Sequence, residues 1–414
     1  MAIDNKDKKV LKSSIEREQN ELACSAEREK IKGSKNLNVP HLRFPEFTGE
    51  WKNTSLGKIG KTFNGLTGKS SADFGQGFPY ITYKSIFDDS KIDISRVEYV
   101  EITDVERKKK TQNEVQYGDV FFTTSSETPD EVGMSSVLLD KIKDCYLNSF
   151  CFGYRLNSLS ETIPEYMRFY LRSQTIRKKM FVLAQGSTRF NISKSEVMGM
   201  SINIPEIEEQ RKIANLLTLL DDRIATQNKI IEKLESLIKG IAQRVAGLGK
   251  PNVRIAECLE CTSSTLQESE VSDSGTYPVY GANGVVGYLD SYNTSDEAIY
   301  IVKDGSGVGS VAYVKGRCSA TGTLNILTAK QDYSLQFLYY ILKVFSFVPY
   351  KTGMAIPHIY FKDYGKAHIF CPSYSEQLKY AKFLSTIDDK LLVEQNILIN
   401  LSLQKQYLLH QMFI

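Results

Sequence analysis

Two long stretches of the chain carry apolar residues at alternating spacings of four and three, which is the pattern of a coiled-coil seam. In residues 205–249 the predicted seam positions are Ile213, Leu217, Leu220, Ile224, Gln227, Ile231, Leu234, Ile238, Ile241, Val245 and Leu248. In residues 372–414 they are Tyr380, Leu384, Ile387, Leu391, Glu394, Leu398, Leu401, Lys405, Leu408 and Met412. The spacing predicts two α-helices, each on the order of 60 Å long.

The two stretches are also copies of one sequence, displaced by about 167 residues. Aligned at this displacement are Pro205 with Pro372, Glu209-Gln210 with Glu376-Gln377, Ala214 with Ala381, and Asp221-Asp222 with Asp388-Asp389. Each copy follows a separate globular segment, so the chain consists of two heads, each followed by the same helix. Such a repeat is suited to holding two sites at a fixed distance.

Exposure of the apolar seam residues to water is unfavourable, so we expect the two helices to pack on each other. The chain order favours an antiparallel pair. Facing residue numbers then sum to about 621, which places Gln227 opposite Glu394 in one polar layer that fixes the register. The same register pairs Ile213 with Leu408, Leu220 with Leu401, Leu234 with Ile387, and Ile241 with Tyr380. The alternative is that each helix packs on its own head or oligomerises separately.

Both heads mix strand-like runs with one helix before closing with a glycine, a loop, a polar turn and a short strand. In the first head, residues 37–204, the predicted strands are Phe78–Tyr83, Val120–Thr124 and Tyr146–Leu156, and the helix lies near Pro164–Leu183. In the second head, residues 250–371, the strands are Tyr277–Tyr280, Ala298–Val302, Ser310–Val314 and Leu324–Thr328, with a helix near Ser334–Phe347. The predicted fold class is α+β: two similar mixed α/β domains and two long helices that form an antiparallel coiled coil with pseudo-two-fold symmetry.

The amino-acid composition says little about the function of the chain. The chain has 414 residues, 42% hydrophobic and 24% charged, and a net charge of +3, which indicates an ordinary globular protein of two or three domains. The cysteines are odd in number and form no disulfide framework, and no signal peptide or membrane-spanning run is present. We therefore expect the protein to be located in the cytoplasm. Residues 1–36, rich in lysine and glutamate, are interpreted as an N-terminal arm that is helical or disordered.

Two glycine-rich segments resemble nucleotide-binding loops without completing the motif. Gly65-Leu-Thr-Gly68-Lys69-Ser70 lacks the first glycine of a phosphate-binding loop, because Phe63 stands in its place. We interpret it as a loop that touches a phosphate backbone. Gly305-Ser-Gly307-Val-Gly309 precedes a strand instead of a helix, so it is interpreted as a turn and not as a dinucleotide site.

Other candidate chemistry is equally incomplete. Cys258-Leu-Glu-Cys261 is one half of a zinc pattern, and the four histidines are scattered, so no metal site is predicted. Glu106-Arg-Lys108 has the Glu-x-Lys form of a nuclease site, but a solvated charged face is the better interpretation. The chain contains no Pro-Pro, which the Asn/Asp-Pro-Pro-Tyr/Phe motif of amino-methyltransferases acting on DNA requires, and no helicase motor. We therefore predict binding surfaces and no catalysis.

Three groups of motifs, taken together, carry a family resemblance. They are Asn38-Val-Pro40-His-Leu-Arg43-Phe44-Pro45-Glu-Phe47 with Trp51 and Leu56-Gly57, then Tyr277-Pro-Val-Tyr280-Gly281-Ala-Asn283-Gly284-Val-Val-Gly287-Tyr288, and the Pro205 and Pro372 repeats with their Glu-Gln pairs. With these motifs residues 37–414 resemble the specificity subunits of type I restriction-modification systems. The resemblance implies that the heads are target recognition domains that each read one half of a split DNA sequence. The helices at 205–249 and 372–414 would then set the spacer and dock two modification subunits.

The resemblance also implies the partners and their cofactors. Modification subunits would bind S-adenosylmethionine and methylate adenine, and motor-nuclease subunits would use ATP and Mg²⁺, whereas this chain would bind no cofactor itself. Because base and phosphate contacts come mainly from Arg, Lys, Asn, Ser and Thr, polar loop residues are the candidates for DNA binding. They are Thr67, Lys69, Lys84, Ser126, Arg189, Asn191 and Lys194 in the first head and Asn283, Lys303, Ser306, Arg317, Thr321, His358 and Lys362 in the second.

Two other classes of function stay open at this point. A two-headed coiled-coil scaffold for non-nucleic-acid partners would have no affinity for duplex DNA, even with modification subunits present. A self-contained nuclease or methyltransferase would bind S-adenosylmethionine or a divalent metal as an isolated chain.

Overall fold

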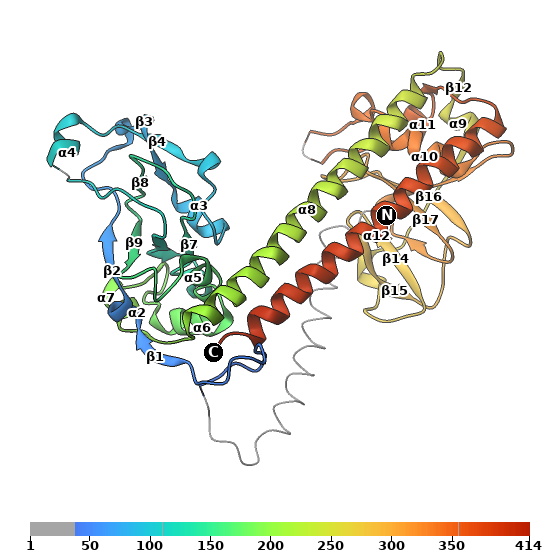
Figure 1. Cartoon of the computed structure of the whole chain (residues 1–414). Helices are drawn as coiled ribbons and strands as arrows, with labels where there is room; N and C mark the ends of the chain where they lie inside the picture. Colours follow the sequence, from blue (N-terminus) through green and yellow to red (C-terminus); the bar gives the residue numbers. More distant parts are fainter. Residues whose placement is uncertain (1–37, 110, 355) are drawn as a thin grey trace. The chain divides into compact units, whose positions relative to one another are not determined.

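The computed structural model describes residues 38–109, 111–354 and 356–414, so the predicted arm at 1–36 lies outside the described residues. The described chain divides into two compact units (Figure 1). The first unit comprises residues 38–225 and 400–414, and the second comprises residues 226–399. Each unit therefore contains one head together with parts of both long helices.

The first head is built on a four-stranded antiparallel sheet of order β2-β9-β5-β7. A three-stranded sheet, β4-β3-β8, and two short pairs, β1-β11 and β10-β6, complete it. The strands are β1 (Lys52–Ser55), β2 (Gly60–Asn64), β3 (Phe74–Ile81), β4 (Glu98–Val100), β5 (Val120–Thr123), β6 (Ser125–Ser126), β7 (Ser135–Val137), β8 (Tyr146–Leu147), β9 (Cys151–Leu156), β10 (Phe190–Asn191) and β11 (Ser201–Ile204). The helices are α2 (Leu56–Ile59), α3 (Tyr83–Asp88), α4 (Asp104–Lys109), α5 (Pro164–Tyr170), α6 (Gln174–Leu183) and α7 (Lys194–Gly199).

The second head repeats this topology. Its four-stranded sheet has the order β13-β19-β16-β17, its three-stranded sheet the order β15-β14-β18, and β12 pairs with β20. In both three-stranded sheets the central strand has one antiparallel and one parallel neighbour. The elements are β12 (Val253–Arg254), α9 (Ile255–Cys258), β13 (Leu259–Ser263), β14 (Tyr277–Gly281), β15 (Gly284–Leu289), β16 (Glu297–Val302), β17 (Val311–Lys315), β18 (Ser319–Ala320), β19 (Leu324–Ala329), α10 (Leu335–Val344), α11 (Phe361–Tyr364) and β20 (His368–Ile369).

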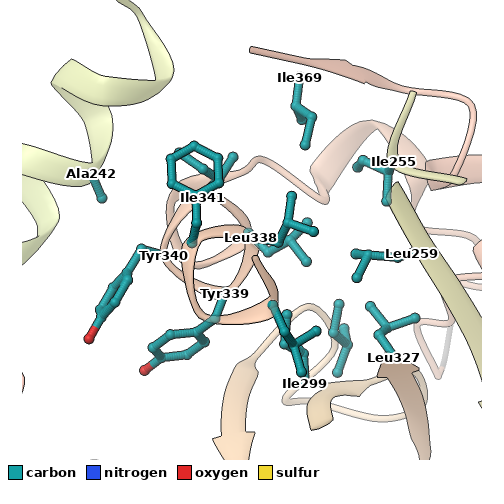
Figure 2. Close-up of a cluster of buried hydrophobic side chains, with 14 of the residues drawn as sticks. Ala242, Ile255, Leu259, Ile299, Leu327, Leu338, Tyr339, Tyr340, Ile341 and Ile369 are labelled. Carbon is teal, nitrogen blue, oxygen red and sulfur yellow. The ribbon is translucent and has the colours of Figure 1, made fainter. Parts of the chain in front are cut away.

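Each head has its core around the central strands of the four-stranded sheet. All four residues of β5 are buried, and so are five of the six residues of β16, because both faces of these strands are covered. In the second unit the strongly apolar helix α10 lies between the sheet and α8. Figure 2 shows its residues Leu338, Tyr339, Tyr340 and Ile341 between Ala242 of α8 and the strand residues Leu259, Ile299 and Leu327.

The two long helices are α8 (Ile207–Ala246) and α12 (Tyr374–Gln411). In the second unit the Gln227 side-chain amide donates to the backbone carbonyl of Glu394 at 3.0 Å and also to its carboxylate. In the first unit the Lys405 ammonium pairs with Asp221. As the residue number rises along α8 from 221 to 227, the number of the contacting residue on α12 falls from 405 to 394, which is the order of an antiparallel pair. Gln227 meets Glu394 in the layer that the sequence register predicts. The residues at the predicted seam positions are buried or half-buried from Ile213 to Val245 and from Tyr380 to Met412.

The repeated glutamines attach each head to the helix that follows it. The Gln210 side-chain oxygen accepts the N–H of Ile163, the residue that caps α5, at 3.0 Å, and its amide donates to Pro205. In the second head Gln377 accepts the N–H of Ser334, the cap of α10, at 2.9 Å, and donates to Pro372. Each glutamine thus satisfies a backbone N–H that the start of a helix leaves unpaired.

The repeated glutamates do not share a role. Glu209 is fully buried and accepts two hydrogen bonds of 2.7 Å from the Arg43 guanidinium, which fixes the N-terminal segment against α8. Glu376 instead accepts from the backbone and hydroxyl of Ser373 at the exposed start of α12.

Three sequence predictions are wrong in detail. The predicted helix near Pro164–Leu183 is two helices, because the chain turns at Leu171–Ser173 and the Ser173 hydroxyl starts α6 by accepting from Ile176. The run Tyr146–Leu156 forms two strands, β8 and β9, that belong to different sheets. Leu248 lies beyond the end of α8 and is 60% exposed, because the helix stops at Ala246 before Gly247 and Gly249.

None of the helices in the described part of the chain combines the length and apolar character needed to cross a bilayer.

Candidate nucleic-acid interface

Several loops of the first head meet at one end of its four-stranded sheet. Strand β2 ends there at Asn64, β5 ends at Thr123, and β9 begins at Cys151, as the strand register shows. The loops that leave these strand ends form what we call the strand-end surface of the head. The second head has the same arrangement, since β13 and β16 end where β19 begins.

A hairpin loop, residues 185–191, stands at the strand-end surface of the first head. Its base is closed by two backbone hydrogen bonds between Gln185 and Asn191, of 2.9 and 2.8 Å. Gly186 has a φ of 133°, and a side chain there would clash with the carbonyl of Arg189, so the turn requires glycine. The loop is anchored to the central strand region because β10 pairs with β6 and Ile192 donates to Thr124 at 3.0 Å.

The second head carries the same hairpin displaced by 167 residues, at 352–358. Thr352 and His358 exchange backbone hydrogen bonds of 2.9 and 2.7 Å, and Gly353 has a φ of 87°. Ile359 donates to Lys303, just as Ile192 donates to Thr124 in the first head. The His358 ring additionally contacts Asp304 through Nδ1 at 2.6 Å, which joins the hairpin to the loop after β16.

The two hairpins differ at their tips. The first presents Ser187, Thr188 and Arg189, and all three are exposed. The second presents Met354 and Ile356, which are also exposed; residue 355 lies outside the described residues. Arg189 and Ile356 occupy the same position, because they are separated by the displacement of the repeat. The same hairpin backbone therefore carries a cationic tip in one head and an apolar tip in the other.

A surface pocket adjoins the first hairpin. It has a volume of about 240 Å³ and is lined by Tyr83, Phe87, Ser126, Glu127, Glu131 and Arg189. The rings of Tyr83 and Phe87 are stacked at 6.1 Å between centres. Burial raises the pKa of the Tyr83 phenol, whose hydroxyl donates to the Ser125 carbonyl at 2.6 Å. The pocket combines aromatic faces, carboxylates and one guanidinium, a mixture that suits recognition of a polar planar group.

Comparisons with known proteins agree with this architecture. The sequence profile described as "Type I restriction modification DNA specificity domain" matches residues 48–236 and again residues 252–403, which together are most of the chain. The chain belongs to this family. Each match covers most of one head and most of the helix that follows it, so the repeat seen in the sequence is a repeat of the specificity domain.

Relatives in the specificity-domain family are distant. The chain is 28% identical over 214 residues to the putative type I restriction enzyme MjaX specificity subunit of Methanocaldococcus jannaschii, across 51% of this chain and 49% of that protein. It is 25% identical over 194 residues to the type I restriction enzyme HindI specificity subunit of Haemophilus influenzae, across 46% of this chain and 40% of that one. These alignments thus span about half, or less, of the relatives' length.

The fold of the specificity-domain family is confirmed by a solved structure. The crystal structure of a type I restriction-modification S subunit from M. genitalium superimposes with a TM-score of 0.62 at 18% sequence identity. The superposition covers 91% of this chain and 99% of that one. The predicted α+β class with two similar heads and an antiparallel pair of long helices is confirmed.

The specificity-domain heads bring together only some of the predicted DNA-binding residues. At the strand-end surface of the first head lie Thr67, Lys69, Ser126, Arg189, Asn191 and Lys194. At that of the second lie Asn283, Lys303, Ser306, Thr321 and His358. Lys194 donates to Asn64 at the end of β2, and its ammonium lies 5.9 Å from the Phe152 ring centre. Exposed Lys362 lies on α11, the counterpart of the α7 helix that carries Lys194.

Two candidates lie elsewhere. Lys84 is paired with Asp88 and lines a pocket with Arg96, Asp89, Asp93 and Glu98. The carboxylates outnumber the cations there, which is unfavourable for a phosphate. Arg317 lies after β17, at the opposite end of the sheet from Lys303, where its guanidinium stacks on Tyr292.

Three candidates at the strand-end surface are engaged or buried. Thr321 is 1% exposed and shares a hydrogen bond with Thr323, and Ser126 is 6% exposed. The Lys69 ammonium donates to Glu106 at 2.7 Å, and this hydrogen bond is the main reason that the pKa of Glu106 is lowered to about 2. Glu106 also accepts from Thr103 and Gln112, so the interpretation of Glu106-Arg-Lys108 as a merely solvated face is wrong for the glutamate.

Four residues at these surfaces were not among the residues predicted from the sequence. Phe150 is 65% exposed, and its carbonyl accepts from Thr124. Met354 and Ile356 form the second hairpin tip, and Glu127 lines the pocket beside Arg189. Phe150, Met354 and Ile356 are apolar, whereas the predicted DNA-binding residues were polar or charged. The displacement of 167 residues could have found Ile356, since it aligns this residue with Arg189.

Proposed function

We propose that this chain is the DNA sequence-specificity subunit of a type I restriction-modification complex, and that each head reads one half of a split target. Membership in the specificity-domain family supports this proposal. The observation that carries it is the pair of equivalent hairpins with different tips, Arg189 in one head and Ile356 in the other. Equal scaffolds with different readout residues are what two unlike half-sites require.

The long helices are proposed to set the spacer between the halves and to dock two modification subunits. In the second unit, Ile230 and Leu237 are exposed on α8 and lie two turns apart on one side of that helix. Tyr374, Leu378 and Leu392 are exposed on α12 at spacings that also share one side. Exposed apolar residues on one helical face are typical of a surface that a partner covers.

Catalysis is proposed to reside in the partners. Modification subunits would bind S-adenosylmethionine and methylate adenine, and motor-nuclease subunits would use ATP and Mg²⁺. The chain's own part would be to bind the duplex and to present it to these subunits, in the compartment that contains the chromosome. The scaffold alternative lacks an observation of its own, whereas the hairpin pair favours DNA readout.

Methylome sequencing tests this proposal. Cells that express the chain with a cognate modification subunit are compared with cells that express the modification subunit alone. We expect a new methyladenine mark at one split motif. A stable complex that leaves no new mark would contradict DNA specificity and favour the scaffold.

A further inference from the structure

The arginines of the first head are almost all committed to the fold. Seven of them use their guanidinium groups in ion pairs with carboxylates of the head or of α8, or in hydrogen bonds to backbone carbonyls of the head. They are Arg43, Arg96, Arg107, Arg155, Arg168, Arg172 and Arg177. Arg189 is the exception. Among the described residues its guanidinium forms no ion pair and no hydrogen bond, although it is exposed at the tip of a constrained hairpin.

The surroundings of Arg189 favour a base edge over a phosphate. Glu127 and Glu131 line the same pocket, and their carboxylates would repel a phosphate placed there. A guanine edge carries no net charge and offers two acceptors, O6 and N7, that match the two parallel donors of a guanidinium. Cytosine, the partner base, has an amino group that can donate a hydrogen bond to a glutamate.

The hairpin also fixes the backbone from which Arg189 projects. The Gly186 turn, the Gln185–Asn191 backbone pair and the anchor of Ile192 on Thr124 fix the backbone on both sides of Arg189. A loop whose backbone is already ordered loses less entropy on binding than a flexible one, which favours the contact that Arg189 makes.

We infer that the hairpin tip is a specificity-determining position in both heads, with Arg189 reading a guanine in one half-site and Ile356 contacting a thymine methyl group in the other. The inference rests on the proposed function and deepens it. Ile356 is 57% exposed although apolar, and apolar contact is the way in which a side chain recognises the thymine methyl group.

The test is methylome sequencing of variants co-expressed with the modification subunit, with assembly of each complex checked by size-exclusion chromatography. We expect Arg189→Ala to make one position of one half degenerate, a G·C pair in the wild-type motif, with discrimination there reduced roughly ten- to a hundred-fold. Arg189→Lys should behave in the same way, because lysine keeps the charge but loses the two-pronged geometry. Arg96→Ala, which removes an exposed arginine already paired with Asp93, is the matched control and should leave the motif unchanged.

Substitution of Ile356 provides the second part of the test. Ile356→Ala should relax one A·T position in the other half. Binding of the wild-type complex should also weaken when uracil, which lacks the methyl group, replaces that thymine in a synthetic duplex, whereas binding of the Ile356→Ala complex should be insensitive to this exchange.

Three results would overturn the inference: an unchanged motif in Arg189→Ala, a uniform loss of binding to all duplexes that Arg189→Lys restores, or relaxation of both variants in the same half. The first excludes base readout by Arg189, the second assigns it to a phosphate, and the third contradicts the equivalence of the tips. Failure of the proposed function is distinguishable, because then the wild-type chain itself leaves no mark.

Discussion

The side chain of Gln227 on α8 donates to both the carbonyl and the carboxylate of Glu394 on α12, and this polar layer lies between apolar positions of the seam. The Glu394 carboxylate is also paired with Lys390, and these two donors, Lys390 first, lower its pKa. Shifting either helix by one turn would place the amide against leucine and the carboxylate against isoleucine side chains of the neighbouring layers. The layer therefore specifies the register of the helices at the expense of some stability.

Replacing one member of this layer should destabilise the second unit, and replacing both should not. In Gln227→Leu the carboxylate loses a buried donor, and we expect a lower thermal midpoint. In Gln227→Leu with Glu394→Leu the layer becomes apolar, and the midpoint should return to the wild-type value or rise above it. Scanning calorimetry measures this; a double variant less stable than the single one would contradict the role of the layer in specificity.

Gln210 should stabilise the junction between the first head and α8. Gln210→Ala leaves the N–H of Ile163 without its partner, so we expect a loss of about 1–2 kcal/mol in the free energy of unfolding. The matched control is Gln243→Ala, which removes an exposed glutamine from the same helix and should change little. Urea titration followed by circular dichroism compares the two; equal effects would exclude the capping role.

The Lys69–Glu106 pair should make the stability of the first head depend on acid pH. The pKa of Glu106 is lowered from 4.5 to about 2, so its stabilisation is complete above pH 4.5 and is lost as the pH falls through about 2. Glu106→Gln should therefore lower the thermal midpoint at pH 7, and the difference from the wild type should shrink between pH 4.5 and 2. A difference that does not vary with pH would show that the charge of Glu106 is unimportant.

The exposed apolar face of α12 should matter for assembly but not for folding. Leu378→Glu and Leu392→Glu should reduce binding of the modification subunit while the thermal midpoint stays near that of the wild type, since both side chains are exposed. Val182→Glu, at a more exposed apolar residue of α6, is the control. Co-purification with the tagged modification subunit gives the answer; unchanged recovery of both helix variants would place docking elsewhere.

The long helices could be predicted from periodicity, because a seam of apolar residues is a local property of the sequence. The contact of Gln227 with Glu394 could be predicted because each seam has a polar interruption and the chain order favours an antiparallel pair. The structure of the heads was harder to predict from the sequence. The turn at Leu171–Ser173 depends on the Ser173 cap and on Arg172, whose guanidinium donates to carbonyls at Ser135, Ile86 and Phe87, and no local pattern reveals such distant partners. For the same reason the polar composition of the loops indicated Lys69 and Thr321 as candidates, although pairing and burial remove both from the solvent.

Lys405 illustrates how tertiary structure changes the meaning of a residue. In the sequence it interrupts the second seam, as a cost to the helix pair. In the first unit its ammonium instead pairs with Asp221, which also accepts from Arg168 of α5. One carboxylate thereby connects α5, α8 and α12, and the interruption becomes a point of attachment.

The central claim is that each head reads its own half of one split target, and exchange of a single head tests it most directly. Residues 250–371 are replaced by the equivalent segment of another specificity-domain protein whose methylation motif is known, and the methylome is sequenced with the modification subunit present. We predict a mark that keeps one half of the original motif and its spacer and takes the other half from the donor. A mark in which both halves change, or neither does, would contradict the account.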